Sequence, residues 1–165
     1  MSSILPCLER LKDLLIRAED SLTLDMIAMS AASRPNMTKG PVRIAFLDDS
    51  EDLRELMPIL LESTLGVECI CFGNLVEFQS RSEEVLQAKV AILDINLGPN
   101  APDGVDAFNW LMDHGFQGKI LFFTGHARTN PQVELAERNG VEILEKPLHP
   151  DKLISVVTRA LNETS

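Results

Sequence analysis

Short apolar runs alternate with stretches of helical periodicity through most of this chain. The runs cover residues 42–47, 67–72, 90–93, 119–124 and 141–145. Residues 90–93 are apolar at every position, which is typical of a strand that is buried on both faces, as in a parallel sheet. Strands that alternate with helices predict an α/β fold, here a doubly wound parallel five-stranded sheet with helices on both faces.

The segments between these runs predict helices. After the first run, Leu56 and Leu60 recur at helical spacing, and either Asp49 or Ser50 could serve as the N-cap. Pro58 lies inside this helix, removes a backbone hydrogen bond and is expected to kink it. The expected helices cover residues 50–65, 75–87, 107–112, 131–139 and 151–161.

Polar side chains stand at the ends of four of the five predicted strands. Asp48 and Asp49 follow the first strand, Asp94 follows the third, Thr124 closes the fourth and Lys146 follows the fifth. Because the carboxyl ends of parallel strands meet at one edge of a sheet, we expect these side chains to lie together.

Three carboxylates at one edge repel one another unless a cation lies among them. Their oxygens suit Mg²⁺ or Mn²⁺ much better than zinc, and Mg²⁺ usually leaves room for phosphate oxygens. Thr124 could donate a hydrogen bond to a phosphoryl oxygen, and Lys146 could neutralise another. Asp94 stands alone after the central run, so it is the expected nucleophile that would form an acyl phosphate.

Composition excludes several classes of function. The chain has 165 residues and a net charge of −10, and residues 1–40 hold five acidic and five basic side chains. The whole negative excess therefore lies on the rest of the chain, which argues against direct binding to nucleic acid. No apolar run reaches the roughly 18 residues of a membrane span, and the N-terminus has no secretory signal.

The three cysteines give an expectation about the compartment. Cys69 and Cys71 would share one face of a strand, too far apart to bridge comfortably, and Cys7 lies far away in the sequence. We therefore expect reduced, buried cysteines and a cytoplasmic protein.

The motifs together resemble the receiver domain of response regulators in two-component systems. Asp48-Asp49, Asp94, Thr124-Gly125 and Lys146-Pro147 stand in the order and strand context of that family, over residues 42–161. The resemblance implies a flavodoxin-like fold. It also implies a signalling protein that is not an enzyme beyond its own Mg²⁺-dependent phosphorylation and autodephosphorylation.

The resemblance further implies roles for individual residues. Asp94 would accept a phosphoryl group from a phosphohistidine of a sensor histidine kinase or a histidine phosphotransfer protein. Mg²⁺ would be bound by Asp49, Asp94 and the backbone carbonyl of Asn96, with Asp48 helping directly or through water.

Thr124 and Lys146 would bind the phosphoryl group and report its presence. In this family that change reshapes a surface of the last strand and the helices beside it. No catalytic or DNA-binding module follows residue 161 in this sequence, so we expect the output to be binding to an unknown downstream protein.

The chain also departs from the family's pattern. Ile143 stands where many receivers have an aromatic residue, and residues 98–102 lengthen the loop after Asp94. The alternative hypothesis is therefore an interaction module that works without phosphorylation. The resemblance also implies that Asn96 and His126 flank the phosphoryl site. Asn96 argues against an aspartyl phosphatase, because that class usually has a carboxylate there as acid or base.

Residues 1–36 form a separate N-terminal helical extension and linker in this interpretation. An apolar seam could dimerise the chain, dock on its own receiver or enter a partner's groove, and the alternative is that the extension is dispensable. The seam consists of Ile4, Leu8, Leu11, Leu15, Ala18 and Leu22.

Overall fold

A computed structural model describes residues 43–99, 101–125 and 131–164 of the chain. The predictions for residues 1–36, including the apolar seam and a homodimer through it, fall outside the described residues. Cys7 and His126 fall outside them too. Among the helices that are described, none is both long enough and apolar enough to cross a membrane.

Five parallel strands form one sheet in the order β2-β1-β3-β4-β5. The register pairs Leu47 of β1 with Leu93 of β3, and Leu93 with Phe122 of β4, so these strands end near the same edge. The predicted parallel five-stranded sheet is confirmed. The strands are β1 Arg43–Leu47, β2 Glu68–Phe72, β3 Val90–Leu93, β4 Lys119–Thr124 and β5 Glu142–Glu145.

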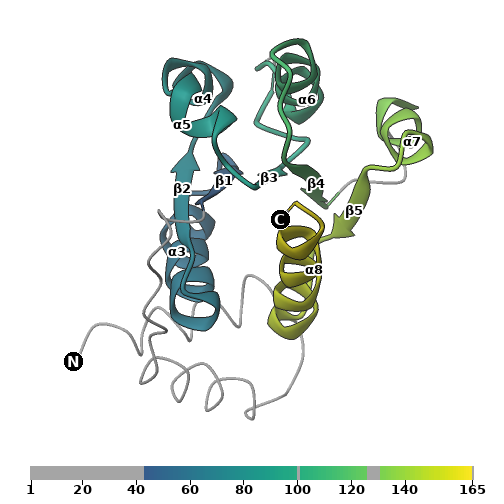
Figure 1. Ribbon diagram of the computed structural model, residues 1–165. Helices are drawn as coiled ribbons and strands as arrows, with labels where there is room; N and C mark the ends of the chain where they lie inside the picture. The colour runs from purple at the N-terminus through teal and green to yellow at the C-terminus, as the bar shows by residue number, and fades with distance from the viewer. Residues whose placement is uncertain (1–42, 100, 126–130, 165) are drawn as a thin grey trace.

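Helices cover both faces of this sheet (Figure 1). α3 and α8 lie on one face, and α4 to α7 lie on the other. On β3, Ile92 belongs to the apolar cluster under α3 and α8, whereas Ala91 and Leu93 belong to the opposite cluster. A strand buried on both faces explains the continuous apolar run. The helices are α3 Glu51–Leu65, α4 Leu75–Ser80, α5 Ser82–Leu86, α6 Gly104–Asp113, α7 Pro131–Arg138 and α8 Pro150–Glu163.

The prediction of one helix over residues 75–87 is wrong. The segment divides into α4 and α5 at Arg81, whose φ of −109° and ψ of 41° are not helical. The Arg81 side chain pairs with Glu84 at 2.6 Å and lies over the ring of Phe72, 5.4 Å from its centroid. These contacts hold Arg81 at the start of a new helix. Pro58 lies inside α3, which runs on to Leu65, and the predicted kink stays a prediction.

The cysteine prediction is confirmed in part. Cys69 and Cys71 are both free thiols, and they pack against the same apolar cluster, with their Sγ atoms 3.9 Å apart. Cys69 is buried, but Cys71 is only half-buried because β2 is an edge strand.

A capping box starts α6, the helix that follows the loop from β3. Asp103 accepts hydrogen bonds from Val105 N and Asp106 N at 2.8 and 3.1 Å, and Asp106 accepts one from Asp103 N. Asp103→Ala should lower the free energy of unfolding by about 1 kcal/mol, since two helical N–H groups lose their acceptor. Asp103→Asn, which keeps a capping oxygen, should lose much less. Urea unfolding of the two variants measures the difference, and equal losses would contradict the role of the cap.

Candidate functional site

The ends of β1 and β3 hold two of the predicted acidic residues. Asp94 N donates to Leu47 O at 2.8 Å, and Asp48 N donates to Phe72 O at 3.1 Å. Both residues thus continue the pairing of the sheet one step past the strands. Their backbones are fixed by neighbouring strands, so their side chains project from a rigid edge.

Lys146, which follows the edge strand β5, contacts both of these carboxylates. Its Nζ lies 2.6 Å from Asp48 Oδ2 and 2.9 Å from Asp94 Oδ2. Lys146 N donates to Thr124 O, and its Nζ lies 4.8 Å from the centroid of the buried Phe123 ring. The lysine is therefore aimed from the end of β5 across β4 toward the acidic residues.

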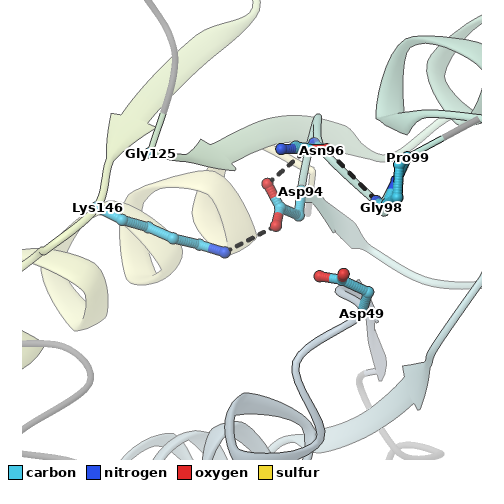
Figure 2. Close-up of a pocket in the computed structure, with 7 residues that line it drawn as sticks. All are labelled: Asp49, Asp94, Asn96, Gly98, Pro99, Gly125 and Lys146. Atoms are coloured by element: carbon cyan, nitrogen blue, oxygen red, sulfur yellow. Dashed lines mark hydrogen bonds and ion pairs between the residues drawn. The ribbon is translucent and has the colours of Figure 1, made fainter.

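Asp48, Asp49 and Asp94 form an acidic cluster at this edge. One carboxylate oxygen from each lies within 4.8 Å of the others. Figure 2 shows Asp49 on the far side of the cluster from Lys146. Three carboxylates and one ammonium leave a formal charge of −2, which a divalent cation would balance. The donors are hard oxygen atoms, so the cluster fits Mg²⁺ or Mn²⁺.

The three carboxylates differ in their exposure to solvent. Asp48 is fully buried and Asp94 is 6% exposed, whereas Asp49 is exposed. Burial raises the pKa of Asp48 above its ordinary value, and the charge and hydrogen bond of Lys146 oppose that shift. A nearby cation would act in the same direction as Lys146 and favour the ionised form.

Asn96 lies beside Asp94 and links it to the next loop. Asn96 N donates to Asp94 Oδ1 at 3.3 Å, and Gly98 N donates to Asn96 Oδ1 at 3.4 Å. The side chain of Asn96 therefore shapes the loop rather than reaching a neighbouring strand. The prediction that its backbone carbonyl binds a metal concerns a different atom and stays a prediction.

A cavity of about 590 Å³ opens over the acidic cluster. Asp49, Asp94, Asn96 and Lys146, all predicted from the sequence, line it together with three residues that lack side-chain chemistry. These are Gly98, Pro99 and Gly125. Gly98 has a φ of 106°, a conformation that suits glycine, and it turns the loop along the cavity (Figure 2).

Thr124 has a different position from the other predicted residues. It is fully buried at the end of β4, and the adjacent Gly125 lines the cavity. Its predicted hydrogen bond to a phosphoryl oxygen therefore stays a prediction. The structure brings Lys146 into contact with Asp48 and Asp94 of the acidic cluster, and it places Thr124 at the same edge of the sheet.

Sequence reasoning missed the residues that support this site. The sequence indicates Gly98 and Pro99 only as part of a lengthened loop, and their place in the cavity wall depends on how that loop folds. Arg54, whose guanidinium donates to Asp48 O at 2.8 Å, was missed entirely. Its only sequence signal is a basic residue among the acidic ones of the first turns of α3.

Known proteins share this fold and its sequence pattern. Residues 44–158 match the family described as response regulator receiver domain. The tetrathionate response regulatory protein TtrR of Salmonella typhimurium is 30% identical over 122 residues. That alignment covers 74% of this chain and 57% of TtrR, so the chain spans little more than half the length of this curated relative.

Crystal structures agree on the architecture. A CheY-like response regulator receiver domain protein from Methanospirillum hungatei matches with a TM-score of 0.65 at 21% identity, over 76% of this chain and 97% of that one. A receiver domain protein from Clostridium thermocellum matches with a TM-score of 0.64 at 23% identity, over 74% and 95%. At these identities the likeness establishes the fold.

Proposed function

The chain belongs to the response regulator receiver family, and from that premise we propose that Asp94 is its phosphoacceptor. The donor would be a phosphohistidine of a sensor histidine kinase or a histidine phosphotransfer protein, the partners with which receivers interact in two-component signalling. The observation that supports the proposal best is the contact of Lys146 Nζ with Asp94 beside two further carboxylates. A sheet edge that served only to support the fold would not require an ammonium group in contact with clustered carboxylates.

The reaction is a transfer of one phosphoryl group. An Asp94 carboxylate oxygen attacks phosphorus, the phosphorus–nitrogen bond of the donor breaks, and the electron pair of that bond returns to the histidine ring. Lys146 neutralises a phosphoryl oxygen, and Thr124 donates a hydrogen bond to another. The product is an acyl phosphate on Asp94, which water later hydrolyses.

The acidic cluster would hold Mg²⁺ or Mn²⁺ during this transfer. Asp48, Asp49, Asp94 and the backbone carbonyl of Asn96 would supply its protein ligands. A divalent cation there would neutralise the carboxylates and the phosphoryl oxygens, so that the nucleophile can approach a negatively charged donor. The cavity above the cluster leaves space for the phosphoryl group.

The output would be binding to a downstream protein. We assign residues 42–161 to the receiver domain and residues 1–36 to an extension that could mediate self-association.

The protein would act in the cytoplasm, where the free thiols of Cys69 and Cys71 would stay reduced.

Acetyl phosphate provides a direct test. Incubation of the protein with acetyl phosphate and Mg²⁺ should add the mass of one phosphoryl group, detected by intact mass spectrometry. Removing the metal with EDTA should slow this gain about a hundredfold, because a metal ion supplies several kcal/mol of charge stabilisation in such transfers. Excess Mg²⁺ added afterwards should restore it.

The alternative is an interaction module that works without phosphorylation. Ile143, in place of the usual aromatic residue, is half-buried against the apolar cluster under α4 to α7, which favours a less mobile surface there. Absence of any mass gain, with small donors and with every cognate kinase, would favour this alternative over the proposal.

A further inference from the structure

The loop that bears Asp48 and Asp49 is supported from outside the acidic cluster. Asp48 N donates to Phe72 O at 3.1 Å, and Ser50 N donates to Asp48 Oδ1 at 2.9 Å. On the remaining side, Arg54 Nη1 donates to Asp48 O at 2.8 Å. The peptide group between Asp48 and Asp49 is therefore held by a side chain that contacts neither carboxylate.

This support matters most for Asp49. Its carboxylate is exposed and makes no hydrogen bond or ion pair with any residue in the described part of the chain. Figure 2 shows it facing the cavity without an interaction to the other residues drawn. The position of this carboxylate thus depends on its backbone, and the carbonyl that Arg54 binds belongs to the peptide group that leads into Asp49.

Arg54 is itself held against Gly73, the residue after β2. A Cβ atom built on Gly73 would lie 3.2 Å from the Arg54 Cζ and Nη1 atoms and 3.5 Å from Nη2. The whole guanidinium group therefore packs on the bare Cα of this glycine. Gly73 N donates to Glu77 Oε2 at 2.8 Å, so the surface beneath the guanidinium is fixed to the start of α4.

We propose that Arg54, seated on Gly73, is a positioning residue that orients Asp49 and Asp48 for binding of the divalent cation. The inference rests on the proposed function, because it concerns the metal site of that function. It assigns a task to the end of β2, the strand end at which the sequence predicts no polar site residue. Arg54 binds the backbone carbonyl of Asp48 and no carboxylate oxygen of the acidic cluster, so it acts through the backbone of the loop.

The direction in which metal affinity changes when Arg54 is replaced distinguishes a positioning role from an effect of its charge alone. Arg54 is a cation close to a cation site, so removing its charge alone would tighten metal binding. Losing the hydrogen bond to Asp48 O would instead loosen the loop and weaken metal binding, since groups that orient metal ligands typically contribute about tenfold or more to affinity. The two explanations therefore predict changes in opposite directions.

The dissociation constant for Mn²⁺, measured on the full chain by electron paramagnetic resonance, tests this inference. Arg54→Gln should weaken Mn²⁺ binding about tenfold. Arg54→Lys should recover part of the loss, because an ammonium can still donate to Asp48 O. Gly73→Ala keeps every charge but displaces the guanidinium by a few tenths of an ångström, and should weaken binding about threefold.

Two comparisons complete the design. Arg43→Gln removes an arginine whose partner Glu68 lies at the opposite end of β1 and β2, and it should leave Mn²⁺ affinity unchanged. The double variant Arg54→Gln with Gly73→Ala should bind no more weakly than Arg54→Gln alone, because the alanine acts only through Arg54.

Unchanged or tighter Mn²⁺ binding by a folded Arg54→Gln protein would overturn the inference. If urea unfolding shows that this variant does not fold, Gly73→Ala decides: weaker binding supports the inference and unchanged binding overturns it. A wild-type protein that fails to bind Mn²⁺ would overturn both this inference and the metal site of the proposed function. Loss of the Arg54 effect alone leaves the proposed function standing.

Discussion

Asp94→Asn should abolish the phosphoryl mass gain that the wild-type protein shows with acetyl phosphate and Mg²⁺. An amide oxygen is a poor nucleophile at phosphorus, and the substitution also removes one ligand charge from the acidic cluster. The side chains have nearly the same shape, so the cavity and the backbone contacts of residue 94 should survive. Intact mass spectrometry over a time course measures the loss.

Asp113→Asn is the matched control for this result. Asp113 is an exposed aspartate at the end of α6 and lies outside the acidic cluster, so its replacement should leave the mass gain unchanged. A remaining mass gain in Asp94→Asn would assign the phosphoryl group to another residue, and peptide mapping would show whether Asp48 or Asp49 accepts it. That outcome would contradict the choice of Asp94.

Gly104→Ala should lower the free energy of unfolding by about 3 kcal/mol, near the upper end of the usual range for overpacking. Gly104 begins α6, and its N–H donates to Ile95 O at 3.0 Å. A Cβ atom there would lie 2.1 Å from Asp94 O and 2.9 Å from Ile95 Cα. Backbone atoms cannot rotate away as a side chain can, so α6 or the end of β3 must move.

The same substitution should also slow phosphorylation of the molecules that remain folded. The clash falls on the carbonyl of Asp94, and a displaced backbone would carry its carboxylate away from Lys146, which lies 2.9 Å from it. Urea unfolding and the rate of mass gain measure the two effects. Gly125→Ala is the stability control, because a Cβ atom on Gly125 meets no atom within 4 Å. Equal stability of the two variants would contradict the argument.

The sheet and its acidic edge could be predicted because they depend on local patterns. A run such as Val90–Leu93, apolar at every position, is typical of a strand that helices cover on both faces. Once the strands are parallel, their carboxyl ends must meet, and Asp48, Asp94 and Lys146 come together although they are distant in the sequence.

Contacts between distant side chains could not be predicted in the same way. The break at Arg81 depends on the Phe72 ring and Glu84, and the spacing of apolar residues gives no sign of it. Arg54 is one of several charged residues at the start of α3, and only the folded chain brings it to Asp48 O and Gly73. Helical periodicity describes what faces the core, not which polar groups meet at the end of a sheet.

The wide spacing of the site residues along the chain has a consequence for folding. Lys146 lies 98 positions from Asp48 and 52 from Asp94, so their ion pairs close long loops within the described part of the chain. Such non-local contacts generally form late, after the entropy of loop closure has been overcome. Until β5 has docked beside β4, the three carboxylates have no ammonium between them. On the proposed function, the ability to accept a phosphoryl group should therefore appear only after β5 has docked beside β4.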